Sequence, residues 1–239
     1  LTDWSQAIKY NMEINGLLKL TLLDFPGRTA CTVFFGGCNL RCPFCHNASL
    51  VRGEGERIGE DEFFDFLTRR RGMLDGVAVT GGEPLLRSGL EDFLARIKEA
   101  GFEVKLDTNG TMPEKLRRIL GMGLCDYVAM DIKSSPEGYS RAAGVFVDMD
   151  AIKESISLLM GGSVDYEFRT TAAKGYVLPE DFEGIGKLIA GAKRYFIQGF
   201  ADSGDLVGEG ASAYTPGEMK AFLETVRKYV PAAELRGVD

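Results

Sequence analysis

Three cysteines lie close together in the segment CNLRCPFC, at Cys38, Cys42 and Cys45. A short loop with this C-x3-C-x2-C spacing can bring three thiolates onto three corners of a cubane iron–sulfur cluster. Clusters that only transfer electrons usually take four thiolates, so a set of three leaves one iron without a protein ligand. An iron with a free coordination site can bind a substrate. The spacing therefore indicates a [4Fe–4S] cluster that takes part in catalysis.

Two other metal sites fit part of the same segment. Cys42, Cys45 and the single histidine of the chain, His46, form the C-x-x-C-H pattern of haem attachment. Haem attachment is typical of exported proteins and leaves Cys38 without a role. Zinc could be bound by the three cysteines and His46, although two adjacent ligands would require an awkward loop to share one ion. His46 is equally well explained as a polar loop residue near a cluster.

The other two cysteines, Cys31 and Cys125, stand in the apolar segments TACTVFF and LCDYVAM. We interpret both as small buried hydrophobic residues. Two cysteines cannot supply a further four-thiolate cluster. The electrons that reduce the first cluster must therefore come from another protein.

Composition and charge narrow the classes of partner. The 239 residues are 45% apolar and 26% charged, as in ordinary soluble domains, and the formal net charge is -7. An acidic surface repels phosphate backbones, which argues against nucleic acid as a partner. No apolar run approaches the ~20 residues that span a bilayer, so we expect no membrane partner and a cytoplasmic location.

Strand-like and helix-like segments alternate along the chain. Short β-branched or aromatic runs predict strands at residues 29–35, 76–80, 102–106, 127–132, 166–171 and 194–198. Apolar residues at helical spacing predict helices at residues 61–71, 90–100, 113–120, 150–160, 179–190 and 216–229. This alternation predicts an α/β fold with a parallel sheet and helices outside it. Six strand–helix units fall short of the eight in a closed TIM barrel, so we predict a partial (βα)6 TIM-like barrel.

The sequence shows no linker that would divide the chain. We expect one domain over residues 1–239, with residues 1–15 as an N-terminal extension and a core at about 17–200. Residues 201–239 are expected to form a loop and a C-terminal helix. Within them, the polar, Gly- and Ser-rich segment 204–214 predicts a flexible loop.

Residues with chemical potential follow the predicted strands, at the point where each strand ends. They are Cys38 after the first strand, Gly81-Gly82-Glu83 after the second, Asp107-Thr108-Asn109 after the third, and Asp131 and Lys133 after the fourth. Ligands of parallel α/β proteins bind at the carboxyl ends of the strands. The sequence therefore predicts one composite site.

The same motifs resemble a known family, because CNLRCPFC has the pattern of the radical S-adenosylmethionine (SAM) signature. Residues 20–51 resemble the glycyl-radical-enzyme activases, and they are most similar to the activating proteins of anaerobic ribonucleoside-triphosphate reductase. Residues 24–27 (DFPG) resemble the D-G-P-G segment of the activases, with Phe25 where Gly is usual. Three later motifs match in order: Gly81-Gly82-Glu83-Pro84, Asp107-Thr108-Asn109-Gly110 and Asp131-Ile132-Lys133. The resemblance covers most of residues 17–200.

The resemblance implies a SAM-binding site around the cluster. Gly81, Gly82 and Glu83 would lie beside the SAM amino group, where glycine permits a close approach of the backbone. Phe44 would pack on the adenine. Lys133 would contact the SAM ribose or carboxylate.

The remaining implied residues lie after strands three to six. Asp107, Thr108 and Asp131 would help to hold a monovalent cation near the SAM carboxylate, since hard oxygen ligands suit such an ion. Asn109 belongs to the same cofactor-binding group. Arg169 could reach the SAM carboxylate or form a structural ion pair. Some activases have a histidine after the sixth strand, where this chain offers Gln198 instead.

The implied activity is that of an oxidoreductase that cleaves SAM reductively to a 5′-deoxyadenosyl radical. This radical would take the α-hydrogen of a glycine in a partner enzyme, which is expected to be the anaerobic reductase. A flavodoxin or ferredoxin would donate the electron. The alternatives are an activase of the pyruvate formate-lyase type and a small-molecule radical SAM enzyme such as 7-carboxy-7-deazaguanine synthase. A non-catalytic metal-binding or electron-transfer module is a further alternative.

Overall fold

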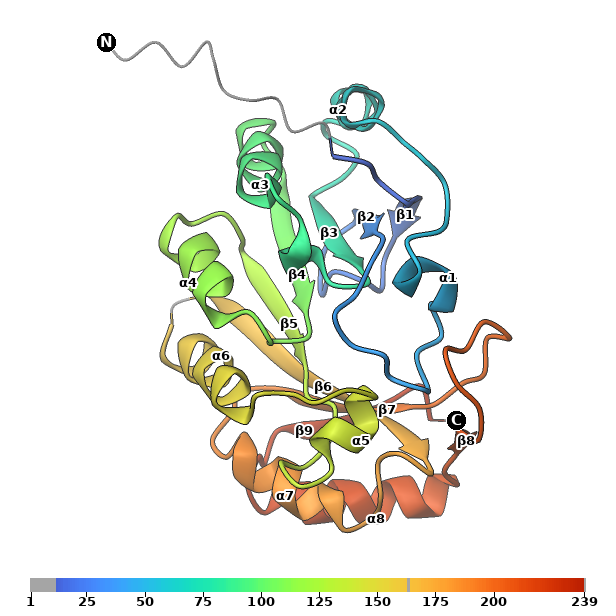
Figure 1. Cartoon of the computed structure of the whole chain (residues 1–239). Helices are drawn as coiled ribbons and strands as arrows, with labels where there is room; N and C mark the ends of the chain where they lie inside the picture. Colours follow the sequence, from blue (N-terminus) through green and yellow to red (C-terminus); the bar gives the residue numbers. More distant parts are fainter. Residues whose placement is uncertain (1–11, 163, 239) are drawn as a thin grey trace.

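Six strands lie side by side in parallel, in the order in which they occur in the sequence (Figure 1). They are β2 (Ala30–Phe35), β3 (Gly76–Gly81), β4 (Glu103–Thr108), β5 (Tyr127–Asp131), β6 (Asp165–Lys174) and β7 (Tyr195–Gly199). This computed structural model describes residues 12–162 and 164–238. The six strands alternate with helices, which confirms the predicted partial (βα)6 barrel.

The sheet continues beyond these strands at both edges. β1 (Gly16–Thr21) pairs antiparallel with β2, and β9 (Ala233–Arg236) pairs parallel with β7. These edge strands do not pair with each other, so the barrel is open between them. A short strand, β8 (Ser212–Ala213), pairs with the end of β6. The sequence patterns did not predict β1, β8 or β9. β8 and β9 are very short. In β1, leucines such as Leu20 are exposed, so apolar and polar residues do not alternate as they do in a typical half-buried strand.

Helices cover the convex side of the sheet (Figure 1). They are α2 (Glu60–Arg69), α3 (Leu90–Glu99), α4 (Pro113–Gly121), α6 (Met149–Gly161), α7 (Asp181–Leu188) and α8 (Pro216–Arg227). Pro113 and Pro216 stand at the first positions of their helices, and Thr215 forms a capping box with Glu218 at the start of α8. Within the part of the chain that the structure describes, none of the helices has the length and apolar character that a bilayer crossing requires.

Three short helical segments were not predicted: α1 (Ala48–Val51), the 3-10 turn η1 (Pro84–Leu86) and α5 (Tyr139–Ala143). Each lies in a connection that follows the carboxyl end of a strand, after β2, β3 and β5 respectively. With three to five residues, they are too short to show helical periodicity. They shape the loops around the predicted site.

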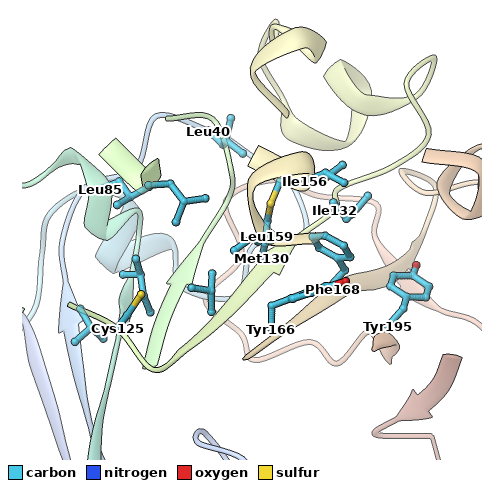
Figure 2. Close-up of a cluster of buried hydrophobic side chains, with 14 of the residues drawn as sticks. Leu40, Leu85, Cys125, Met130, Ile132, Ile156, Leu159, Tyr166, Phe168 and Tyr195 are labelled. Carbon is cyan, nitrogen blue, oxygen red and sulfur yellow. The ribbon is translucent and has the colours of Figure 1, made fainter. Parts of the chain in front are cut away.

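The convex face of the sheet is apolar and forms the main core. Phe35 of β2 packs edge-on against Phe93 of α3, with 5.5 Å between the ring centroids. Figure 2 shows Met130 of β5 close to Ile156 and Leu159 of α6, and all three side chains are buried in the same cluster. Because side chains alternate along a strand, the residues between these core positions must point to the concave face.

The concave face carries mainly polar side chains. The strand register pairs Thr32 with Ala78, Ala78 with Lys105, and Lys105 with Tyr127, so these four residues point to the same side of the sheet. Lys105 is almost completely buried there, at 2% exposure. A charged residue inside a strand of this kind indicates that the interior of the barrel is a binding surface.

The amino-terminal end of the barrel interior is closed by side chains. Phe25 packs with Ala30 and Tyr127, and the two rings lie 6.2 Å apart. The Tyr127 hydroxyl donates a hydrogen bond to Glu167 (2.9 Å), and the Arg236 guanidinium of β9 donates to the other oxygen of the same carboxylate (2.9 Å). The interior is therefore closed at the amino-terminal ends of the strands.

The N-terminal segment takes part in the fold more than its prediction as an extension suggests. Ile14 is completely buried and bridges to Ile58 of the α1–α2 connection. The side-chain oxygen of Asn15 accepts a hydrogen bond from the amide of Gly36 (2.7 Å). Met12, Ile14 and Asn15 are therefore buried in the fold, and residues 1–11 of the predicted extension 1–15 lie outside the described residues.

Candidate active site

The three clustered cysteines lie on one loop that follows β2 at the carboxyl edge of the sheet. Cys42 is buried and the other two are partly exposed, and all three border the same cavity. The amide of Cys45 donates a hydrogen bond to the carbonyl oxygen of Cys42 (3.0 Å), which forms a tight turn. Gly37, with a φ of 81°, allows the chain to leave β2 sharply before Cys38.

Backbone hydrogen bonds from other segments hold this cysteine loop. The amide of Gly37 donates to the carbonyl oxygen of Leu50 in α1 (2.7 Å). The amide of Arg41 donates to the carbonyl oxygen of Ala143 in α5 (2.9 Å). The short helices α1 and α5 thus fix the loop from two sides.

The segment 204–214, predicted as a flexible loop, also contacts the cysteine loop. The amide of Gly208 donates to the carbonyl oxygen of Pro43 (2.8 Å). The carboxylate of Asp205 accepts hydrogen bonds from the amide and the hydroxyl of Ser49 (3.0 and 2.7 Å), at the start of α1. This segment therefore fastens the cysteine loop, a role that its composition did not indicate.

The carboxyl ends of the strands surround one cavity of about 300 Å³. It brings together all but one of the predicted site residues. Those that line it are Cys38, Cys42, Phe44, Cys45, Gly81, Gly82, Asp107, Thr108, Asn109, Asp131, Lys133, Arg169 and Gln198. His46, whose role the sequence left open, also lies in the wall. The residues after the strand ends thus form one composite cavity.

Close packing against the cysteine loop explains why glycine stands at positions 81 and 82. The amide of Gly82 donates to the carbonyl oxygen of Phe35 (2.8 Å), and the amide of the next residue, Glu83, donates to that of Gly37 (2.9 Å). A Cβ atom on Gly82 would overlap the backbone of Gly37. The resemblance explained these glycines by a close approach of the backbone to SAM. The end of β2, which lies against Gly82, is an additional reason for a residue without a side chain.

Glu83 lies behind the cavity wall and is completely buried. One of its carboxylate oxygens accepts hydrogen bonds from the Thr108 hydroxyl (2.9 Å) and from the amide of Leu85 (3.1 Å), and the other accepts from the amide of Asn109 (2.7 Å). Burial raises the pKa of Glu83 to about 7, although these donors act in the opposite direction. The sequence placed this carboxylate beside an ammonium group, whereas here it holds the end of β4.

Five charged residues form one ion network at the floor of the cavity. Arg169 bridges the two acids, with Nη1 3.4 Å from Asp107 Oδ2 and Nε 3.0 Å from Asp131 Oδ1. The ammonium of Lys133 lies 3.0 Å from the other oxygen of Asp131. Lys105 contacts Asp107 from beneath. Three cations face two carboxylates, so the network has an excess of positive charge.

The network fixes the charge states of its members. Burial by itself would raise the pKa of Asp131, but Lys133 and Arg169 together hold it well below its usual range. Burial would likewise lower the pKa of Arg169, and the two carboxylates raise it instead. Asp131 and Arg169 are therefore ionised at neutral pH, and the excess of cations over carboxylates in the network suits a ligand carboxylate.

Two of the three clustered thiols, those of Cys38 and Cys42, are mainly protonated before a metal binds. Burial raises the pKa of Cys42 to about 11 and also raises the pKa of Cys38. The Lys133 ammonium opposes both shifts because it favours the thiolate. Thiolates are the metal-binding form, so the binding of a cluster must release protons here.

The donor set of the cavity fits an iron–sulfur cluster with three protein ligands. Soft thiolates select such clusters, and the remaining cysteines, Cys31 and Cys125, do not line the cavity. Cys31 points to the convex side in β2, and Cys125 precedes the amino end of β5. Among the described residues, no three His, Cys, Asp or Glu side chains are arranged to hold a single metal ion.

The three residues predicted to hold a monovalent cation do not fit that role. The carboxylates of Asp107 and Asp131 are already engaged by cations of the chain. The Thr108 hydroxyl donates to Glu83 and accepts from the amide of Gly110 (3.1 Å). The carboxylates of Asp107 and Asp131 and the Thr108 hydroxyl therefore already have partners within the protein.

Two further predicted residues, Phe44 and Gln198, also line the cavity. Phe44 is buried and packs against Tyr176, with 6.1 Å between the ring centroids. Gln198 lies at the end of β7, where some activases have a histidine. Of the two roles considered for Arg169, the structure shows the ion pair.

Several residues of the site were not identified from the sequence. Thr32, Phe34, Thr80 and Thr171 line the cavity, and Lys105 lies beneath it. Each of them lies two positions along the chain from a predicted site residue or from another of this group. The period of two in a strand could have identified them, because residues at that spacing share a face.

Comparisons with known proteins agree with this geometry. The family model of the radical SAM superfamily matches residues 32–179. The chain is 30% identical, over 236 residues, to a Methanocaldococcus jannaschii protein named "Putative glycyl-radical enzyme activating enzyme", covering 95% of this chain and 96% of the relative. It is 35% identical over 139 residues to the pyruvate formate-lyase-activating enzyme of Clostridium pasteurianum, covering 55% and 57%.

Two further likenesses are more limited. The chain is 38% identical over 95 residues to the 7-carboxy-7-deazaguanine synthase of Hyperthermus butylicus, covering 39% of this chain and 40% of the relative. The crystal structure of Streptococcus suis SuiB bound to precursor peptide SuiA matches with a TM-score of 0.70 and 14% identity, covering 86% of this chain and 48% of that chain. At this identity the match shows a shared fold.

The chain belongs to the radical SAM superfamily. It is a radical SAM oxidoreductase, and membership of the family implies a [4Fe–4S] cluster and SAM as its cofactors. The three-cysteine loop and the cationic floor of the cavity are the corresponding features of this chain.

Proposed function

We propose that this enzyme is a glycyl-radical-enzyme activase and that its protein substrate is anaerobic ribonucleoside-triphosphate reductase. One observation carries the proposal: three thiols of one loop and the cations Lys133 and Arg169 line the same cavity, in a barrel whose edge strands do not pair. The near full-length likeness to the Methanocaldococcus jannaschii protein supports the activase role.

The chain's own residues would bind and orient SAM. When bound, a [4Fe–4S] cluster with one free iron supplies the electron that splits SAM into methionine and a 5′-deoxyadenosyl radical. Cys38, Cys42 and Cys45 hold this cluster. Lys133 and Arg169 attract the SAM carboxylate, and Phe44 offers an apolar surface to the adenine.

The polar strand ends complete the proposed binding site. Gly81 and Gly82 leave their backbone accessible in the cavity wall, while Glu83 orients Thr108 and Asn109 from behind. Gln198 supplies both a donor and an acceptor on the far side. Enclosure of SAM by these groups excludes water from the radical.

The open side of the barrel suits a protein substrate. β1 and β9 do not pair, so a loop of a partner enzyme could approach the cavity between them. Glycine suits the abstraction because it has no side chain to block the approach. Its radical is also stabilised by the two flanking amides.

The electron comes, in this proposal, from a flavodoxin or ferredoxin. The described part of the chain has no second group of cysteines beside the cavity that could hold another cluster. A one-electron donor must therefore dock from outside. An alternative partner is a glycyl radical enzyme of the pyruvate formate-lyase type, which the Clostridium pasteurianum likeness supports.

The deciding experiment is anaerobic reconstitution with iron and sulfide, followed by incubation with SAM, a reductant and the purified candidate reductase. We expect 5′-deoxyadenosine together with the electron paramagnetic resonance signal of a glycyl radical. The Cys42→Ala variant should give neither product. A reductase in which the target glycine is replaced by alanine should abolish the radical signal.

A small-molecule reaction of the 7-carboxy-7-deazaguanine synthase type is the second candidate, since part of the chain is 38% identical to such an enzyme. Normal 5′-deoxyadenosine formation without a glycyl radical, on either reductase or pyruvate formate-lyase, would favour it. If zinc were bound and SAM remained intact under reduction, both candidates would be wrong and a metal-binding module would remain.

A further inference from the structure

The guanidinium of Arg169 stands between the two carboxylates that were predicted to bind a monovalent cation. Its Nη1 atom lies 3.4 Å from Asp107 Oδ2, and its Nε and Nη2 atoms each lie 3.0 Å from Asp131 Oδ1. The side chain is largely buried, at 16% exposure. Arg169 therefore occupies the place where an ion shared by both carboxylates would lie.

Lys105 supplies a second cation from the interior of the barrel. Its side chain is 2% exposed, and its ammonium pairs with the Asp107 oxygen that Arg169 does not contact. Lys105 and Asp107 are two positions apart in β4, so both point to the concave face. A buried lysine beside a single carboxylate neutralises that carboxylate permanently, because separation of the pair would leave an unpaired buried charge.

We infer that Arg169 and Lys105 replace a free monovalent cation in this enzyme, so that SAM binds without an alkali-metal ion. The inference rests on the proposed function, because it takes SAM as the ligand of this cavity. An alkali-metal ion needs several free oxygen ligands, and here the carboxylates are committed to fixed side chains. A guanidinium offers the same charge with directed donors, and it cannot dissociate from the site.

The two residues have different parts in this arrangement. Arg169 lines the cavity and keeps N–H groups for a ligand carboxylate. Lys105 lies beneath the wall and is a positioning residue: it neutralises Asp107, which would otherwise draw the guanidinium of Arg169 toward itself. With Lys133, the three cations exceed the two acids, and the surplus charge remains available to SAM.

The test compares the dissociation constant of SAM in potassium chloride and in tetramethylammonium chloride, at equal ionic strength. The reconstituted enzyme is used under anaerobic conditions, and binding is measured by equilibrium dialysis. For the wild-type enzyme we expect the same dissociation constant in both salts, within about twofold, because no site for the small ion is free. A tenfold weaker affinity without potassium would overturn the inference.

Variants show whether the fixed cations are the cause. In tetramethylammonium chloride, Arg169→Ala should bind SAM about tenfold or more weakly, and potassium should restore part of this loss by entering the vacated space. Lys105→Met should also become dependent on potassium, which a purely structural role of Lys105 would not produce. Lys174→Met is the matched control, since Lys174 forms an exposed pair with Glu218 outside the cavity.

The outcomes separate this inference from the proposed function. Wild-type affinity of Arg169→Ala and Lys105→Met in both salts would overturn the inference and leave the activase proposal intact. Failure of the wild-type enzyme to bind SAM in either salt would overturn the SAM site itself, and the inference with it. The glycyl-radical assay in potassium chloride tests the activase role independently.

Discussion

The carbonyl oxygen of Gly37 accepts a hydrogen bond from the amide of Glu83 at 2.9 Å. Through this bond, the turn after β3 is attached to the loop that carries all three clustered cysteines. Gly82, the residue before Glu83, lies so close to Gly37 that it has no room for a side chain. The glycines of the GGE motif and the cysteine loop therefore form one structural unit.

Substitution of Gly82 by alanine should disrupt this unit. The added methyl group overlaps the backbone of Gly37, which cannot move independently of β2. We expect Gly82→Ala to lower the free energy of unfolding by about 1–3 kcal/mol, and to reduce the iron bound after reconstitution. Denaturant unfolding of the cluster-free protein and an iron assay are the measurements.

Gly217→Ala is the matched control for this substitution. A Cβ at Gly217, in the first turn of α8, meets no atom within 4 Å. Alanine is the better helix former by about 0.5–1 kcal/mol, so this variant should be slightly more stable than the wild type. Equal stability of the Gly82 and Gly217 variants would show that the close contact is unimportant.

The cysteines should separate into two groups when each is replaced by alanine. Cys38→Ala, Cys42→Ala and Cys45→Ala should each bind less iron and sulfide and should form no 5′-deoxyadenosine. Cys125→Ala, outside the cavity, should keep both properties of the wild type. Quantitative iron and sulfide analysis with chromatography of the nucleoside provides the test. Full iron content in Cys42→Ala would disprove the assignment of the cluster ligands.

Glu83 should make stability depend on pH. Burial raises its pKa from 4.5 in the unfolded chain to about 7 in the folded protein. A raised pKa means that the folded state prefers the protonated carboxyl group. The contribution of Glu83 to stability is therefore complete below pH 4.5, and it is lost as the pH rises to about 7.

The comparison of the wild type with Glu83→Gln isolates this contribution, because glutamine does not titrate. Between pH 4.5 and 7, the wild type should lose up to about 3 kcal/mol of unfolding free energy relative to the variant. Denaturant unfolding of cluster-free protein at several pH values measures the difference. A constant difference across this range would mean that the carboxyl group is ionised in both states.

Removal of the Asp205 carboxylate should loosen the cysteine loop. Asp205 accepts two hydrogen bonds from Ser49 at the beginning of α1, which directly follows the loop. We expect Asp205→Ala to lose its cluster to a chelator faster than the wild type does, with little change in global stability. The control is Glu209→Ala, which removes the same charge from an exposed residue of the same segment. Equal rates in both variants would exclude this role for Asp205.

Much of the site could be predicted because it depends on chain order. Cys38, Asp107 and Asp131 each follow a buried β-rich run, and parallel strands bring their carboxyl ends to one edge. The alternation of strands and helices was therefore enough to predict the fold and to predict that these residues lie close together. The short strands β8 and β9 lacked a recognisable pattern, and they were missed for that reason.

The positions of individual side chains could not be derived in the same way. Glu83 was expected beside a ligand in the cavity, yet its carboxyl group accepts hydrogen bonds from the Thr108 hydroxyl and the Asn109 amide at the end of β4. Asp107 and Asp131 were expected to hold an ion, and the sequence did not indicate that they pair with Lys105 and Arg169. Such pairings depend on which strands become neighbours and on their register, and a single segment does not specify them.

The bond between Asp205 and Ser49 joins residues 156 positions apart. The three cysteines are synthesised long before residue 205, so a nascent chain presents its thiols on a loop that lacks this restraint. The loop acquires its final shape only when synthesis is nearly complete. Iron that binds before residue 205 is made would therefore meet a loop without its last restraint.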